Sequence, residues 1–218
     1  MDSIVELCGL KPDARVLEVG CGCGRIATAL ASYISENGSY DGFDVAAPLL
    51  NWCRPELQPR LPNFRFQLAD EVHAPGHNPS GTKNAAEFSF PYASGSFDLV
   101  ILSSVLTHMM PEAIENYLRE TARVLCSGGS AFISVFLFDE AAAIAVSSGT
   151  TIFDFRHRIG PCLTFDAEHP EEGVACEETW FLPQVNLAGL RLANVRRGDW
   201  REVRSYAITQ DYVVANKA

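Results

Sequence analysis

One run of nine residues constrains this chain more than any other feature. Val16–Gly24 reads VLEVGCGCG, so a segment typical of a buried strand carries one acid and enters a loop with glycine at every second position. A helical segment, expected over residues 24–34, follows directly. Glycine adopts positive φ and leaves room where a Cβ would obstruct a ligand, and the first N–H groups of a helix lack intrahelical partners. The run therefore predicts that a small molecule binds at the carboxyl edge of a sheet.

The spacing of these glycines separates two kinds of cofactor site. Dinucleotide-binding loops follow the pattern G-x-G-x-x-G, whose third glycine permits close packing of the helix on the strand. Here Gly20, Gly22 and Gly24 alternate with single residues, and Glu18 lies on the strand itself. Asp44 ends the next expected strand about twenty residues beyond the loop, which is the distance typical of a carboxylate that binds ribose hydroxyls. An NAD-dependent oxidoreductase is therefore the less favoured enzyme.

Strand and helix segments alternate along the chain. We expect parallel strands at residues 14–19, 39–44, 63–68, 97–102 and 131–138, helices at 24–34, 46–54 and 111–125, and two final strands near 191–198 and 206–214. This alternation predicts an α/β fold with a parallel sheet and helices on both faces. The nearly continuous apolar residues of the fourth and fifth strands are typical of the buried centre of such a sheet.

Two stretches, residues 70–95 and 139–181, interrupt this order without a clear period. Each follows an odd-numbered strand. We therefore expect both at the ligand-binding edge of the sheet, as insertions within one domain that spans residues 1–218. His157 and Glu177, in the second stretch, are candidates for contact with a substrate.

Composition excludes several kinds of partner. The net charge of -10 repels phosphate backbones, and the arginines between Arg191 and Arg204 are interpreted as solvated. The seven cysteines are odd in number and form no C-x-x-C pattern, which indicates reduced thiols. No segment approaches the roughly 20 apolar residues of a membrane span, and the N-terminus lacks the positive start of a signal peptide. We expect a cytoplasmic protein that binds neither nucleic acid nor membrane; its oligomeric state stays open.

The run at Val16–Gly24 together with Asp44 resembles the first motifs of the class I S-adenosylmethionine-dependent methyltransferases, in particular the small-molecule enzymes of types 11 and 25. Residues 87–100 resemble the adenine loop that leads into the fourth strand, residues 103–109 the segment beneath the methionine part of the cofactor, and residues 123–129 the following helix end and glycine turn. The resemblance implies a Rossmann-like, doubly wound, mostly parallel seven-strand sheet that ends in a C-terminal antiparallel hairpin.

The same resemblance implies that S-adenosylmethionine is the cofactor and that its methyl group passes to an oxygen or nitrogen atom of a small molecule. A non-catalytic module that binds S-adenosylmethionine or a nucleotide is the alternative from a different class. The resemblance also assigns roles. Glu18 would anchor the methionine amine, Gly20, Cys21, Gly22 and Gly24 would carry the backbone beneath the cofactor, Asp44 would bind the ribose, Val45 would pack on adenine, and Ser103 would offer its carbonyl to the amine.

The acid that binds the adenine amino group has two candidates. Asp70 directly follows the third expected strand, where many relatives carry this acid, but an insertion follows it here. Glu87 is favoured because it precedes a Phe-Pro-Tyr segment and adjoins Phe88, whose ring would cover adenine.

The acceptor chemistry points to one histidine. An oxygen nucleophile needs a general base, whereas an amine needs only to be neutral and aligned. His108 follows the fourth strand near the expected methyl group and is the candidate catalytic base; its structural alternative is to cap the helix that begins at Pro111. Asp70, His73 and His77 lie in a loop rich in proline and glycine, so no metal site is expected.

Overall fold

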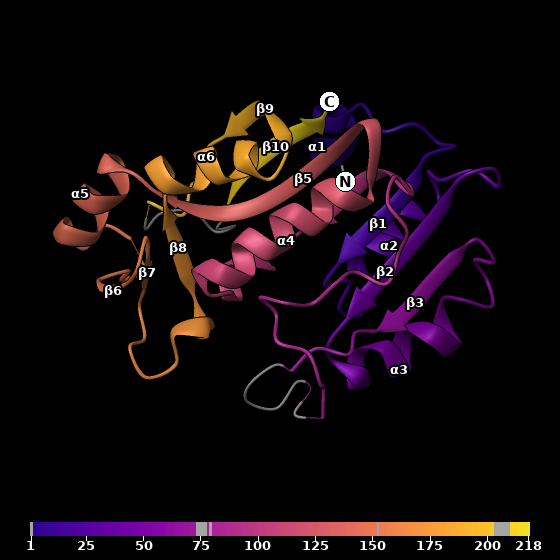
Figure 1. The fold of residues 1–218 in the computed structure, drawn as a ribbon, viewed down its shortest axis with the longest axis horizontal. Helices are drawn as coiled ribbons and strands as arrows, with labels where there is room; N and C mark the ends of the chain where they lie inside the picture. Colours follow the sequence, from indigo (N-terminus) through magenta and orange to yellow (C-terminus); the bar gives the residue numbers. More distant parts are fainter. Residues whose placement is uncertain (1, 73–77, 79, 152, 203–209) are drawn as a thin grey trace.

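A twisted, mostly parallel sheet forms the centre of the molecule (Figure 1). The computed structural model describes residues 2–72, 78, 80–151, 153–202 and 210–218, without the side chains of residues 2 and 3. Seven strands run in the order β3-β2-β1-β4-β5-β10-β9. They are β1 (Arg15–Val19), β2 (Ser39–Asp44), β3 (Phe64–Leu68), β4 (Phe97–Leu102), β5 (Leu125–Phe138), β9 (Leu190–Arg196) and β10 (Asp211–Lys217). The first five are parallel, and β10 pairs antiparallel with both β5 and β9. The predicted fold class is confirmed.

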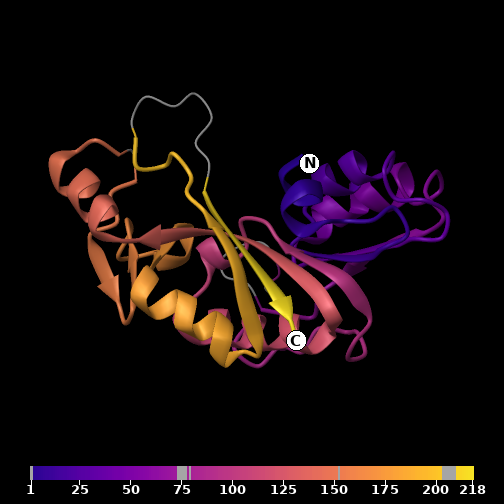
Figure 2. The same cartoon turned by 90° about the horizontal axis from the view of Figure 1, so that it is seen from above.

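Helices cover both faces of this sheet (Figure 2). Alternate residues of a strand point to opposite faces, so Leu17 and Val19 of β1 pack on one side while Val16 packs on the other. The first side is covered by α4 (Pro111–Val124) and α6 (Glu178–Leu187). The second is covered by α1 (Asp2–Cys8), α2 (Arg25–Leu30) and α3 (Ala47–Glu56). No helix among the described residues is long and apolar enough to cross a membrane.

The second irregular stretch is in fact structured, so the expectation of a long irregular segment is wrong there. It contains α5 (Glu140–Ser148), β6 (His157–Ile159), β7 (Cys162–Thr164), the 3-10 helix η2 (Pro170–Glu172) and β8 (Val174–Glu177). β8 pairs parallel with the far end of β5, and β7 and β6 follow antiparallel, which Figure 1 shows at the end of the long β5 ribbon. Strands of three or four residues are too short to display a period, and they form here because β5 extends beyond β4 and leaves backbone groups to pair.

Other differences lie at element ends. In residues 70–95, Glu71 and Lys83 form a β-bridge, and the buried Asn78 amide donates to the carbonyl oxygens of Ala69 and Glu71. The described part of the last predicted strand is β10, which begins at Asp211, whereas the predicted start near residue 206 lies outside the described residues, as do His73 and His77.

A buried carboxylate fixes the base of the second insertion. Asp211 accepts hydrogen bonds from the backbone N–H of Leu137 and Gly198 and from Nε1 of Trp200, each at 2.9 Å. The Arg201 guanidinium donates to both of its oxygens at 2.9 and 3.2 Å and lies 4.4 Å from the Trp200 ring centroid. This network joins β10 to the end of β5, where the insertion begins.

We predict that Asp211→Ala lowers the free energy of unfolding by about 3–5 kcal/mol. It leaves the N–H of Leu137 and Nε1 of Trp200 without this acceptor, and it removes the nearer of the two carboxylates that pair with the mostly buried Arg201. Urea denaturation measures the change. The control is Asp13→Ala at an exposed turn, which should stay within about 0.5 kcal/mol of the parent. Equal effects of the two substitutions would contradict the assignment.

Candidate active site

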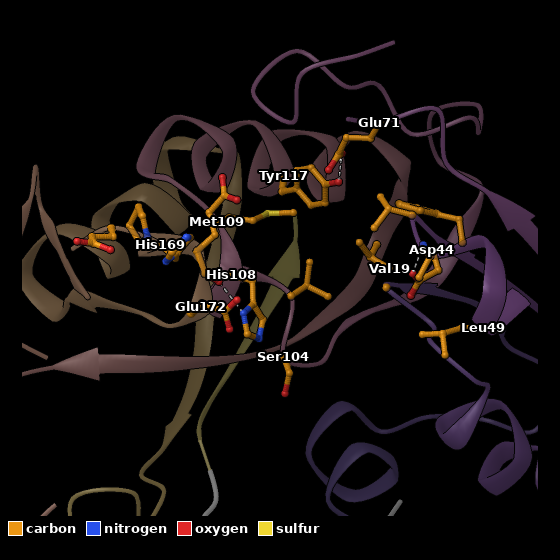
Figure 3. Close-up of a pocket in the computed structure, with 18 residues that line it drawn as sticks. Val19, Asp44, Leu49, Glu71, Ser104, His108, Met109, Tyr117, His169 and Glu172 are labelled. Carbon is orange, nitrogen blue, oxygen red and sulfur yellow. Dashed lines mark hydrogen bonds between the residues drawn. The ribbon is translucent and has the colours of Figure 1, made fainter. Parts of the chain in front are cut away.

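A cavity of about 620 Å³ opens at the carboxyl ends of β1, β2 and β4 (Figure 3). Here the chain order reverses, since β2 and β3 extend to one side of β1 and β4 and β5 to the other. Open α/β sheets bind ligands at this switch point, and the volume is within the usual range for small molecules. Its lining consists of Val19, Gly20, Phe43, Asp44, Val45, Ala46, Leu49, Glu71, Ser104, Val105, His108, Met109, Tyr117, Glu168, His169, Pro170, Glu171 and Glu172.

The glycine loop adopts the backbone that its sequence predicts. Gly20 has φ 69° and Gly24 has φ 76°, in the left-handed region that favours glycine. A Cβ on Gly20 would lie 2.6 Å from Cγ2 of Val105, and one on Gly24 would lie 2.7 Å from Cδ1 of Leu57. Gly20 forms part of the cavity wall, so the absent side chain leaves backbone open to a ligand.

Asp44 fixes the loop against the end of β2. Its Oδ2 accepts the backbone N–H of Gly22 at 2.7 Å, and its Oδ1 accepts that of Ala46 at 2.7 Å. Each carboxylate oxygen keeps a further lone pair, and Asp44 lines the cavity beside Val45. The structure thus brings Gly20, Asp44 and Val45 together as predicted neighbours.

Glu18 and Cys21 lie beneath the loop instead of on the cavity wall. Glu18 is buried, and the Tyr40 hydroxyl donates to its carboxylate on the sheet face that packs against α2 and α3. Burial raises the pKa of the Glu18 carboxyl to about 8, against the opposing effect of the Tyr40 hydrogen bond. Cys21 is buried against Gly42.

The acid that faces the cavity after β3 is Glu71, which the sequence analysis did not select. Glu71 is buried and accepts a hydrogen bond from the Tyr117 hydroxyl, and both side chains line the cavity (Figure 3). Burial raises the pKa of the Glu71 carboxyl to about 7, and the Tyr117 hydrogen bond partly offsets this. The one indication of this position in the sequence is that Glu71 directly follows Asp70, at the start of the insertion.

Asp70, Glu87 and Phe88, which were also expected near adenine, lie outside the cavity wall. Asp70 is exposed, and its carboxylate accepts the N–H and hydroxyl of Thr82 at 2.9 and 2.6 Å. Glu87 is exposed and does not belong to the cavity wall. Phe88 is buried in the core, where its ring packs against Phe43 and Phe90 at centroid distances of 5.9 and 6.2 Å.

The loop after β4 reaches the cavity through Ser104 and Val105, whereas the predicted Ser103 is half-buried outside it. Ser104 has φ 58°, a left-handed backbone that costs energy for a residue other than glycine. Its N–H donates to Oγ of Ser134 at 2.7 Å, and both hydroxyls donate to Oε1 of Gln210. These bonds from β5 and the segment before β10 hold the strained turn.

His108 lies in the 3-10 helix η1 (Leu106–His108) and lines the cavity. Its Nδ1 is 2.8 Å from the carbonyl oxygen of Glu171. A carbonyl only accepts, so Nδ1 carries the proton, and the neutral ring then presents the lone pair of Nε2. No side chain caps α4, whose N-cap is Met110, so the capping alternative for His108 is wrong. The ring instead holds the second insertion.

That insertion supplies residues 168–172 to the cavity wall, among them Glu168, His169 and Glu172. The two candidates that sequence analysis chose in this stretch lie elsewhere: His157 is exposed on β6, and Glu177 pairs with Arg158 at 2.5 Å. Among the described residues no three metal-ligating side chains are grouped as a metal site.

The fold and the cavity define an α/β protein with a ligand-sized cavity at the switch point of its sheet. The methyltransferase domain family matches residues 16–129, more than half of the chain. The chain therefore belongs to this family, and S-adenosylmethionine is its cofactor.

Three known proteins illustrate the relationship. The arsenite methyltransferase of Aquipseudomonas alcaligenes is 31% identical over 141 residues, which are 62% of this chain and 38% of that protein. The ubiquinone/menaquinone biosynthesis C-methyltransferase of Ectopseudomonas mendocina is 26% identical over 166 residues, 75% of this chain and 58% of that protein. The chain thus spans less than two thirds of either relative.

The third is a solved structure, the 1,6-didemethyltoxoflavin-N1-methyltransferase of Burkholderia thailandensis with bound 1,6-didemethyltoxoflavin and S-adenosylhomocysteine. It superposes with a TM-score of 0.63 at 18% identity, over 99% of this chain and 74% of that chain. This likeness concerns the fold.

We predict a pH dependence of stability from Glu18. Between pH 4.5 and about 8 the unfolded chain has lost this proton while the folded protein retains it, so the contribution of Glu18 to the free energy of unfolding falls as pH rises through this interval. Subtracting the values for Glu18→Gln from those of the parent, by urea denaturation at each pH, should give a difference that declines there and is flat above it.

The control is Glu87→Gln, which removes a carboxylate from an exposed position on the protein surface. A difference for Glu18→Gln that rises with pH, or that matches the control, would show that Glu18 is not held in its protonated form.

Proposed function

We propose that the protein transfers the methyl group of S-adenosylmethionine to an oxygen or nitrogen atom of a small molecule. The observation that carries the proposal is one continuous cavity whose wall includes both Gly20 and Asp44 and, from the segment after β4, Ser104, Val105 and His108. Figure 3 shows Asp44 and Leu49 on one side, His169 on the other, and His108 between them. The cavity joins a cofactor subsite to an acceptor subsite.

The residues present fit the cofactor. The free lone pairs of Asp44 suit the two ribose hydroxyls, and Glu71 suits the adenine amino group. The bare backbone at Gly20 admits the methionine part, and Val45 and Leu49 supply apolar surface for the adenine ring. When bound, the cofactor supplies a methyl group activated by a sulfonium.

The residues of the protein then orient the acceptor and take up its proton. Nε2 of His108 accepts the proton of an acceptor hydroxyl or N–H as the new bond forms. The charge that develops on the ring is stabilised by the carbonyl oxygen of Glu171, which accepts from Nδ1 at 2.8 Å. Glu18 supports the site from below by filling the space under the glycine loop with Tyr40.

We predict that Asp44→Ala weakens S-adenosylhomocysteine binding by about 1.5–3 kcal/mol, the scale of hydrogen bonds to a charged group. Isothermal titration calorimetry measures it. Asp41→Ala is the matched control, because Asp41 lies on the same strand, pairs with Arg65 at 3.7 Å and is not part of the cavity wall.

The same titration distinguishes a methyltransferase from an NAD-dependent oxidoreductase. Heat with S-adenosylhomocysteine and none with NAD supports the proposal. The reverse result would assign the site to an oxidoreductase, and unchanged affinity in Asp44→Ala would remove Asp44 from the ribose subsite.

We predict that His108→Ala lowers kcat about 10²–10⁴-fold for a hydroxyl acceptor, because the proton then has no positioned base. His157→Ala, an exposed histidine away from the cavity, should leave kcat unchanged. Turnover is followed as transfer of a radiolabelled methyl group across a range of pH. If His108→Ala regains the parent rate at high pH, His108 orients the insertion instead of taking the proton.

A further inference from the structure

The turn after β4 has an unfavourable backbone at one residue. Ser104 has φ 58°, and every other positive φ in the part of the chain that the structure describes belongs to a glycine. A left-handed backbone is unfavourable for a residue with a Cβ, and it persists where surrounding contacts hold it. Ser104 also lines the cavity (Figure 3). The contacts that hold this turn therefore also shape the site.

Three hydrogen bonds hold the turn, and two of them end at one amide oxygen. The N–H of Ser104 donates to Oγ of Ser134 at 2.7 Å, and the Ser134 hydroxyl donates to Oε1 of Gln210 at 2.5 Å. The Ser104 hydroxyl donates to the same Oε1 at 3.2 Å. Ser134 is buried on β5, and Gln210 directly precedes β10. The turn is thus held by β5 and by the start of the strand that pairs with it.

The conformation of this turn determines two parts of the cavity wall. Val105 follows Ser104 and packs against the bare backbone of Gly20, where a Cβ would lie 2.6 Å from Cγ2 of Val105. The carbonyl oxygen of Val105 accepts the N–H of His108 at 3.0 Å at the start of η1. A change of φ at Ser104 would therefore move Val105 relative to the glycine loop and would also move the short helix that carries His108.

We propose that Gln210 is a positioning residue for methyl transfer, which holds the turn after β4, through Ser134 and Ser104, in the conformation that fits the cofactor. This rests on the cofactor site proposed above. Gln210 is not among the described residues that line the cavity, so it acts through the turn and not by touching the cofactor. It adjoins Asp211, whose hydrogen bonds fix the base of the second insertion. The start of β10 therefore supports both the cofactor side of the cavity and the insertion.

The expected effect follows from the unfavourable backbone. When position 210 lacks an acceptor, the Ser104 turn relaxes in the free protein toward a backbone with negative φ. The cofactor then binds only the fraction of molecules that retains the left-handed turn, and its apparent affinity falls by that fraction. Glycine adopts positive φ about as readily as negative φ. A glycine at position 104 therefore makes the turn much less dependent on Gln210.

A double-mutant cycle between positions 104 and 210 tests the proposal. S-adenosylhomocysteine is titrated by calorimetry into the parent, Gln210→Leu, Ser104→Gly and the double variant; leucine keeps the approximate size of glutamine and removes the acceptor. We expect Gln210→Leu to weaken binding about 5–10-fold in the parent and less than about twofold in the Ser104→Gly background. Gln210→Glu, which restores an acceptor oxygen, should recover most of the loss.

The matched control is Gln58→Leu, at an exposed turn outside the cavity wall, which should leave the affinity unchanged in both backgrounds. Urea denaturation shows that each variant is folded, and Gln210→Ala replaces Gln210→Leu if the latter does not fold. Equal losses in the two backgrounds, or unchanged affinity in Gln210→Leu, would overturn the inference. Failure of S-adenosylhomocysteine to bind the parent would instead overturn the proposed function.

Discussion

The site depends on how two adjacent residues at the end of β2 hold the glycine loop. The carbonyl oxygen of Phe43 accepts the N–H groups of Gly20 and Cys21 at 2.9 and 3.0 Å, and the carboxylate of Asp44 accepts that of Gly22 at 2.7 Å. Three successive donors of the loop are thereby satisfied by one strand end. The loop stays open toward the cavity, and the carboxylate that fits a ribose is fixed by the bond that shapes the loop.

Much of this half of the site could be predicted from the sequence, because it depends on local chemistry. Alternating glycines specify positive φ at fixed positions, and an acid at a strand end lies at the ligand edge whatever the rest of the chain does. The acid proposed to bind the adenine amino group was harder to predict. The sequence does not distinguish among the three acids Asp70, Glu71 and Glu87. In the structure, the Tyr117 hydroxyl donates to the carboxylate of Glu71, which lines the cavity, whereas the Thr82 hydroxyl donates to the exposed carboxylate of Asp70.

The acceptor half could not be predicted in the same way. It is built by residues 168–172, whose position depends on pairing between β8 and the extended end of β5, a contact between segments about forty residues apart. The family match ends at residue 129, before this insertion begins. The contact between His108 and the carbonyl of Glu171 joins the two halves. In the proposed function, the shared fold supplies the cofactor side and the insertion supplies the acceptor side.

In the proposed function, one cavity places the cofactor across Gly20 with its reacting sulfur toward His108. A crystal structure with bound S-adenosylhomocysteine tests it most directly. We predict ribose hydroxyls within hydrogen-bonding distance of Asp44, the adenine amino group at Glu71, and the sulfur open toward Nε2 of His108 and Glu172. A ligand bound outside this cavity, or one whose sulfur faces away from His108, would contradict the account.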